Sequence, residues 1–438
     1  MNALNGRRIV VGVSGYGPRR PGAKVGHPPA QLPTSEAFPM TGPATIDLLS
    51  PTFRVLSDEV RAAAAQHWYA QTPLGPAILT SEDCVAMQND RRLHHSGGTE
   101  HMLAQGISDG PVADMWARLV LNIEGPDHHR LRRLVNPAFA PTAVERLRGR
   151  IREIAEELVD GFAGEGHCEF MAQFSDLFPP RVMFHLLGIP AAMQPDFLRW
   201  GQDIALLLSY DVAANHDRLA AAIEGICGAT DELCEQRRSA PGDDLLSVLV
   251  AASDGGDKLS QDEIRAMVTV LVLGGQDSTR NQIALGLATF TDHPDQWALL
   301  RERPELAGAA VEEMIRYNPV DPILWRIAPT DVDCRDLQIA AGTRIWLFAA
   351  LAQSESDTPG KPLPFDITAE REPHLAFGHG THYCLGAYLA RAEMVEALPI
   401  LARRMPDLAL DGDPVYRPEL SGFVGPVVLP LKFTPTTA

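Results

Sequence analysis

The longest helical pattern in the chain, residues 260–292, most strongly limits the folds open to it. Ser260 and Glu263 form a capping box, in which each side chain bonds to the backbone N–H of the other residue and so marks a helix start. Pro294 ends the pattern beyond Asp292. At about 1.5 Å per residue this helix is roughly 50 Å long, enough to cross a whole domain. A helix of this length requires a large domain built around it.

Most of the remaining chain also follows a helical period. Amphipathic stretches rich in Ala and Leu recur at 56–69, 111–122, 126–136, 141–164, 194–210, 214–236 and 304–317. Strand-like runs are short and lie at 77–80, 337–339, 344–347 and 427–429. The chain has 438 residues, 45% of them hydrophobic, and no repeat or linker divides it. We therefore predict one large domain, mainly α with small β-sheets, over residues 45–438.

The ends and the composition exclude several classes of protein. Residues 1–44 are predicted to be a flexible leader, because this region is rich in Gly, Pro and Arg. The longest apolar run, 267–273, is far shorter than the roughly 20 residues of a membrane span, so we expect no membrane anchor. A formal net charge of −18 argues against a nucleic-acid binder. Six cysteines without paired spacing favour a reduced compartment, and we expect a cytoplasmic monomer.

The run that carries the chemistry is 377–386, Phe-Gly-His-Gly-Thr-His-Tyr-Cys-Leu-Gly, which leads into a helical pattern at 385–404. Cys384 lies where free backbone N–H groups and the helix dipole lower a thiol pKa and favour the thiolate. The glycines allow the backbone to approach a large flat group, and a thiolate so placed can bind heme iron. Two other interpretations are an ordinary buried cysteine and a zinc site made of Cys384, His374, His379 and His382.

This run resembles the heme-binding loop of the cytochrome P-450 family, and three companion motifs extend the resemblance over about residues 45–435. The resemblance implies the cytochrome P-450 fold, heme b (iron protoporphyrin IX) as the cofactor and Cys384 as the iron ligand. It also places Phe377 and Gly378 of the loop at the heme. The positions that bind the heme propionates in the family are taken here by His128, Arg132, Arg326 and His382.

The first companion motif lies in the middle of the long helix. Gly274 and Gly275 cost a helix interior roughly 1–2 kcal/mol, which either close helix packing or a local opening over a ligand would explain. The family has its oxygen-binding groove here, which implies proton delivery by Asp277 and a hydroxyl beside the oxygen from Ser278. Ser278 replaces the usual Thr and lacks the methyl that restricts the rotamer. Thr279 is expected to lie about 100° further around the helix.

The second companion motif is the pair Glu313 and Arg316, which share a helix face. An exposed ion pair is the ordinary meaning of this spacing. In the family the pair is buried and braces the segment before the cysteine loop. Residues 349–372 lack the family's usual Asn-Arg-Asp run and the Arg after Phe365-Asp366, and Arg371 is the candidate to replace that Arg.

The resemblance implies a monooxygenase that inserts one atom of O2 into a small, largely apolar substrate, such as a terpenoid, a steroid or another product of secondary metabolism. The chain has no flavin or dinucleotide motif, so electrons are expected from NAD(P)H through ferredoxin reductase and ferredoxin. Arg130, Arg133 and Arg391 are expected to form a basic docking patch. Two alternatives remain open: peroxide-driven or non-hydroxylating heme-thiolate chemistry such as coupling or nitration, and a non-enzymatic heme sensor.

The substrate pocket is expected to be mainly aliphatic, with His94, His95 and Glu100 as possible polar anchors. By family position, its walls should include Met102, Leu103, Ile107, Leu206, Leu207, Leu271, Ile323, Leu324, Phe423 and Val424.

Overall fold

The computed structural model describes residues 42–50, 52–95, 98–209, 211–254, 259–354, 362–417 and 422–437. The predicted leader therefore falls almost entirely outside the described residues and stays a prediction. Contacts with the domain have begun by Ala44, whose carbonyl accepts a hydrogen bond of 2.8 Å from the backbone N–H of Gln71. Among the helices of this described part, none combines enough length with enough hydropathy to cross a bilayer.

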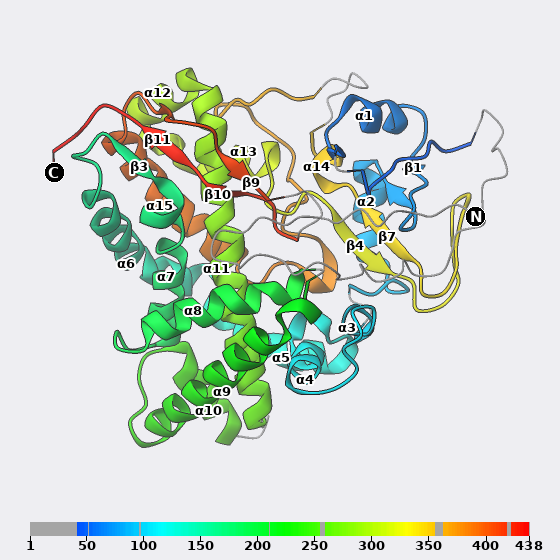
Figure 1. Cartoon of the computed structure of the whole chain (residues 1–438), viewed down its shortest axis with the longest axis horizontal. Coiled ribbons are helices and arrows are strands. Elements are labelled where there is room, and N and C mark those ends of the chain that lie inside the picture. Colours follow the sequence, from blue (N-terminus) through cyan, green and yellow to red (C-terminus); the bar gives the residue numbers. More distant parts are fainter. Residues whose placement is uncertain are drawn as a thin grey trace.

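Helices make up most of the molecule, and small sheets lie beside them (Figure 1). The α-helices are α1 (Asp58–Ala64), α2 (Ser81–Asn89), α3 (Glu100–Leu103), α4 (Pro111–Arg118), α5 (Gly125–Val135), α6 (Pro141–Asp160), α7 (Phe178–Leu187), α8 (Gln194–Ile204), α9 (His216–Ser239), α10 (Leu245–Asp254), α11 (Gln261–Asp292), α12 (Pro294–Glu302), α13 (Ala307–Tyr317), α14 (Ala349–Ala352) and α15 (Ala387–Arg404).

Helix α11 runs through the centre of the molecule and packs against α7, α8, α9 and α13 (Figure 1). The capping box of Ser260 and Glu263 is present, with both reciprocal hydrogen bonds. The helix ends at Asp292, and Pro294 begins α12. These features confirm the predicted spine and both of its ends. The helix is α-helical throughout, so the predicted opening at Gly274-Gly275 is wrong.

The largest sheet has four strands in the order β1-β2-β7-β4 and lies on the other side of the molecule from α6 and α15 (Figure 1). Only the β2–β7 pair is parallel. Smaller sheets join β3-β11-β8, β10-β9 and β5-β6. The strands are β1 (Tyr69–Ala70), β2 (Ala77–Ile78), β3 (His167–Glu169), β4 (Leu324–Ile327), β5 (Val332–Cys334), β6 (Leu337–Ile339), β7 (Arg344–Leu347), β8 (Ala409–Leu410), β9 (Val415–Tyr416), β10 (Pro426–Val428) and β11 (Pro430–Lys432).

The predicted fold class, mainly α with small sheets in one domain, is confirmed. Each predicted helical stretch contains a helix, although 111–122 and 194–210 end in 3-10 turns. Helices α2, α7, α10 and α12, which are 9–10 residues long, were not predicted, and neither were the four-residue helices α3 and α14. Such short helices gain their stability from packing against the rest of the protein more than from their own sequence.

Candidate active site

A cavity of about 430 Å³ lies between the middle of α11, the loop before α15 and the beginning of β4. Its wall is mostly apolar, as expected, and it contains four of the predicted residues, namely Leu271, Ile323, Leu324 and Phe423. The prediction was wrong for the other six, which do not line it. Met102 and Leu207, for example, are fully buried in the core, and Leu103 is half exposed on the outer side of α3. For residues in helices, the rotation of the helix about its axis determines which side chains face the cavity. The sequence pattern does not determine this rotation to within one residue.

The cysteine loop holds its sulfur at this cavity. Gly378 and Gly380 have φ angles of +69° and +73°, which only glycine adopts without strain. The backbone N–H of Cys384 donates to the carbonyl of Phe377 over 2.9 Å, which closes the loop on itself. The Cys384 side chain is exposed to the cavity, and Phe377 lines the same space. The loop geometry therefore matches the prediction of a cysteine presented at a helix start.

The acidity of this cysteine differs from the prediction. Burial among protein atoms raises the pKa of Cys384, while hydrogen bonds from the N–H groups of Gly386 and Ala387 and the charges of Arg132 and Arg391 lower it only in part. The helix start lowers the pKa, as predicted, but the increase in pKa caused by desolvation is larger. The prediction of a lowered pKa in the protein alone was therefore wrong. A bound cation such as iron would supply the missing stabilisation of the thiolate.

Zinc has no support as an alternative. No three of the histidine, cysteine or acidic side chains in the described residues are close enough to share a metal ion. The Nε2 atoms of His374 and His382 instead lie 3.2 and 2.9 Å from the carboxylates of Glu312 and Glu124.

Three imidazoles stack at one end of the cavity. The ring of His382 lies 4.3 Å from that of His128 and 4.7 Å from that of His95. Burial lowers the pKa of His128 to about 4, with help from His382, so this ring is neutral at pH 7. Burial opposes ionisation of Glu124 as well, yet the hydrogen bond from His382 holds its pKa at about 2. Glu124 was not predicted as a site residue, although it lies beside the His128 motif in the sequence.

Two arginines of the predicted propionate set have no carboxylate partner among the described residues. Arg132 lines the cavity and donates to the carbonyl of Tyr383 over 3.0 Å. Arg326 is buried, does not line the cavity and donates to the carbonyl of Trp325 over 2.8 Å. Burial lowers the pKa of Arg326 to about 10. Because buried cations are normally paired, this end of the cavity suits a ligand that carries carboxylates.

The residues present therefore fit a heme. Among the described residues, the buried Nδ1 atom of His128 has no hydrogen-bond partner, and Arg132 and Arg326 offer donors to two carboxylates. Cys384 is exposed at the same cavity as His128, Arg132 and His382. Neutral imidazole can donate one hydrogen bond to a propionate, and guanidinium can donate two.

The centre of α11 forms the opposite wall. A Cβ atom at Gly275 would lie 2.4 Å from Met183 of α7, so this glycine allows close helix packing. Gly274 meets no protein atom in that direction and lines the cavity. Close packing therefore explains Gly275, and close approach to the cavity explains Gly274. The helix achieves both without opening.

Asp277 and Ser278 have different environments. Ser278 lines the cavity and donates from Oγ to the carbonyl of Gly274 over 2.9 Å. Thr279, the next residue around the helix, lines the cavity too and therefore offers a second hydroxyl there. Asp277 is buried beside the cavity, with its carboxylate 2.9 Å from Arg417 and 3.2 Å from Arg280. Burial opposes its ionisation, but these two arginines hold the pKa of Asp277 below its ordinary value.

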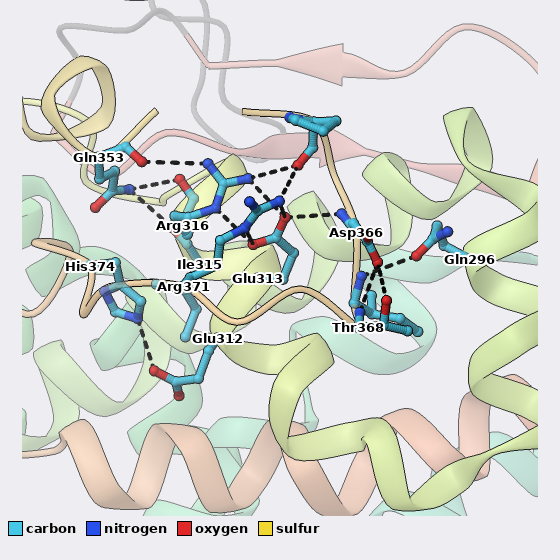
Figure 2. Close-up of polar contacts among 12 residues, drawn as sticks. Gln296, Glu312, Glu313, Ile315, Arg316, Gln353, Asp366, Thr368, Arg371 and His374 are labelled. Atoms are coloured by element: carbon cyan, nitrogen blue, oxygen red, sulfur yellow. Dashed lines mark hydrogen bonds and ion pairs between the residues drawn. The ribbon is translucent and has the colours of Figure 1, made fainter. Parts of the chain in front are cut away.

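Figure 2 shows the brace around Glu313. Glu313 and Arg316 are each 3% exposed, and Arg316 donates to both carboxylate oxygens over 2.7 and 2.8 Å. Arg371 lies 3.3 Å from the same carboxylate, and the backbone N–H of Asp366 donates to it over 3.0 Å (Figure 2). The predicted buried brace and the predicted substitution by Arg371 are confirmed, and the exposed ion pair is excluded.

Gln353 links this brace to the cysteine loop, at the position where the sequence departs from the family. Its Nε2 donates to the carbonyl of Arg316 over 2.8 Å, and its Oε1 accepts from the backbone N–H of Leu375 over 2.8 Å. An amide can donate and accept at once, so it joins α13 to the segment that leads into Phe377.

The polar residues of the cavity were only partly predicted. His95 lines it, whereas His94 pairs by its backbone with Ile327 and Glu100 is exposed at the start of α3. The cavity also contains His101, Asp321, Arg344 and Glu393, none of which the sequence analysis named. Only the nearby predicted wall residues Ile323 and Leu324 pointed to Asp321.

Comparison with known proteins agrees with this geometry. Residues 189–404 match the family model of cytochrome P-450. Luteothin monooxygenase of Streptomyces thioluteus is 34% identical over 394 residues, which are 89% of this chain and 95% of that protein. Nocardicin C N-oxygenase of Nocardia uniformis subsp. tsuyamanensis is 32% identical over 408 residues, 91% of this chain and 99% of that protein. The crystal structure of CalO2 aligns with a TM-score of 0.80 at 29% identity, covering 88% of this chain and 100% of that chain. The chain therefore belongs to the cytochrome P-450 family and is a monooxygenase of that family.

Proposed function

We propose that this monooxygenase binds heme b through Cys384 and oxidises a small, largely apolar natural product with O2. The observation that carries the proposal is the cavity itself. It joins an exposed cysteine, Arg132 and an apolar wall. A second arginine without a carboxylate partner among the described residues, Arg326, is buried outside the cavity lining. The bound heme supplies the iron at which O2 is reduced. Relatives named for luteothin and nocardicin C support a substrate from secondary metabolism.

The residues around the cavity have different proposed roles. Cys384 binds the iron, Phe377 and Gly378 hold the loop against the heme, and His128, Arg132, Arg326 and His382 bind the propionates. His382 must then exchange its hydrogen bond with Glu124 for one with a propionate. The apolar wall orients the substrate and excludes water.

Proton supply falls to Asp277 and Ser278. Because Asp277 is held as an anion by Arg417 and Arg280, it stores no proton at pH 7. It acts as a relay that takes a proton from solvent and passes it on once one of these ion pairs opens. The Ser278 hydroxyl, which can donate and accept, hands the proton to the oxygen side of the cavity.

Electrons come from NAD(P)H through ferredoxin reductase and ferredoxin. The expected docking patch is smaller than predicted, since Arg130 and Arg391 bond to Glu263 and Glu312. A shallow hollow lined by His129, Arg132, Arg133 and Thr381 remains a basic surface beside the cysteine loop and suits an acidic ferredoxin. A cytoplasmic monomer stays a prediction.

The decisive test is the spectrum of the reduced, CO-bound protein. We expect the red-shifted Soret band of thiolate ligation in the wild type and its complete loss in Cys384→His. Cys334→Ser is the matched control, because Cys334 lies in β5 and does not line the cavity. An unchanged band in Cys384→His would overturn the assignment of the ligand. Product formed with hydrogen peroxide but not with NADPH, ferredoxin reductase and ferredoxin would favour the peroxide-driven alternative.

A further inference from the structure

Two carboxyl groups at the cavity, those of Asp321 and Glu393, have no role in the chemistry described so far. Asp321 lies between α13 and β4 and lines the cavity together with Pro322, Ile323 and Phe423. Within the described ranges, no hydrogen bond or ion pair reaches its side chain. An ionised group without a partner in such surroundings is costly, so the position calls for an explanation.

The backbone that carries Asp321 is firmly held. The Gln282 side chain on α11 donates to the carbonyl of Asn318 over 3.0 Å and accepts from the N–H of Val320 over 2.9 Å. The carbonyl of Val320 accepts from Val424, and that of Pro322 accepts from Ala350, over 2.8 and 3.0 Å. The carboxyl group is thus placed at the cavity by hydrogen bonds on both sides of it, which is the preorganisation that a binding group needs.

The other charged and titratable groups at the cavity leave Asp321 uncompensated. Burial alone raises its pKa to about 7, with no contribution from a neighbouring charge. Arg344 is held between the rings of Trp325 and Trp346, at 4.7 and 5.4 Å. Burial lowers the pKa of His95 to about 3 and that of His101 to about 4, so both are neutral at pH 7. His128, Arg132 and His382 belong to the propionate end. Burial also raises the pKa of Glu393 on α15 far above its ordinary value.

We propose that Asp321 selects substrates that carry one positively charged nitrogen on an otherwise apolar body. A cation gives the carboxylate the charge partner that the protein omits, whereas the apolar wall accepts the rest of the molecule. A neutral hydroxyl could be bound equally well by Asn or Gln, without the cost of a buried charge. The net charge of −18 also draws cations toward the protein. This inference rests on the proposed function, because it assigns a substrate class to the same cavity.

The test uses two probes of the same shape, N,N,N-trimethyl-1-adamantylammonium and 1-tert-butyladamantane. They differ in one charge, and the quaternary nitrogen cannot bind iron. Binding is measured by calorimetry on holoenzyme that already shows the thiolate CO band, so a failure here does not bear on the proposed function. We expect the wild type to prefer the ammonium probe at least about tenfold and Asp321→Asn to lose that preference. Glu393→Gln, which removes the other carboxyl group at the cavity, should keep it.

The pH dependence of probe binding is a second, independent test. The probe charge is fixed, so ammonium affinity in the wild type should rise as pH increases through about 7, when Asp321 ionises, and level off above. Asp321→Asn should show no such rise. Equal affinity of the wild type for both probes would overturn the proposal, and so would a preference that survives Asp321→Asn. Loss of the preference in Glu393→Gln alone would place the cation at α15 and overturn it as well.

Discussion

Glu313 and Asp321 are acidic residues eight positions apart in the chain, and they differ in their hydrogen-bond partners and in their access to the cavity. Glu313 receives hydrogen bonds from Arg316, Arg371 and a backbone N–H, in a region without access to the cavity. Asp321 receives none from the described residues and lines the cavity. A carboxylate whose bonds are all made within the protein holds the structure together. One that is left open at a cavity is available to a ligand.

Asp277 shows an intermediate case. Its charge is balanced by Arg417 and Arg280, as in the brace, yet its neighbour Ser278 lines the cavity, as Asp321 does. The charge of Asp277 is balanced within the protein, and Ser278 connects it to the cavity. This arrangement suits a group that passes protons but does not bind the substrate. In the proposed assignment, the three acids therefore separate structural support, proton transfer and substrate selection.

The largest effect is expected at the brace. Glu313→Ala leaves the buried Arg316 without its carboxylate and should cost about 3–5 kcal/mol in free energy of unfolding. Because the brace is tied to the cysteine loop through Gln353, heme incorporation should fail as well. The measurements are the heme content of the purified protein and its urea denaturation midpoint.

The adjacent residue supplies the control. Glu312 also pairs with an arginine, Arg391, and with His374, and Figure 2 shows the contact with His374. Its side chain, however, is 46% exposed. Glu312→Ala should cost no more than about 1 kcal/mol. Similar losses in both variants would show that burial does not distinguish the two sites.

The next effect concerns coupling of electrons to product. Ser278→Ala should still consume NADPH and O2 but release mostly hydrogen peroxide, with product per NADPH reduced severalfold, because the hydroxyl that orders proton delivery is gone. Ser278→Thr should keep or improve coupling, since the methyl restricts the rotamer. Thr279→Ala is a needed comparison, because Thr279 also lines the cavity. If only Thr279→Ala uncouples the enzyme, the relay runs through Thr279.

Much of this arrangement was readable from the sequence, for physical reasons that differ by site. The spine was predicted from caps and periodicity, which are local, and Glu313 with Arg316 from a three-residue spacing. The cysteine loop was predicted from a run of ten residues that resembles a known family. Local pattern does not determine which of two opposed effects is larger, so the sign of the Cys384 pKa shift was missed. It also does not show which side chains meet from distant segments, so Glu124 and Asp321 were found only in the fold.

The smallest effect, and the sharpest test of the comparison, is the pH dependence of stability at Asp321. Its pKa in the folded protein is about 7, whereas an unfolded Asp titrates near about 3.9. Between these values the folded protein holds a proton that the unfolded chain has released, so rising pH destabilises the wild type. Asp321→Asn removes this penalty. Its gain over the wild type should be near zero below about pH 4 and reach about 1–2 kcal/mol above about pH 7, less than the full shift implies because water enters the cavity.

Asp277→Asn should behave in the opposite way, which makes it the matched control. Arg417 and Arg280 depress the pKa of Asp277, so its carboxylate stabilises the folded protein above the unfolded pKa, and this contribution is lost on acidification. Its variant should be less stable than the wild type at pH 7, and the difference should shrink toward low pH. Urea midpoints of ligand-free holoenzyme across about pH 5 to 8 would show the rise for Asp321→Asn. Over the same range the Asp277→Asn difference should stay nearly constant, because it shrinks only below the unfolded pKa of about 3.9. A destabilised Asp321→Asn protein at the upper end of that range would mean that the carboxylate has a partner in the fold, and the contrast with Glu313 would then not hold.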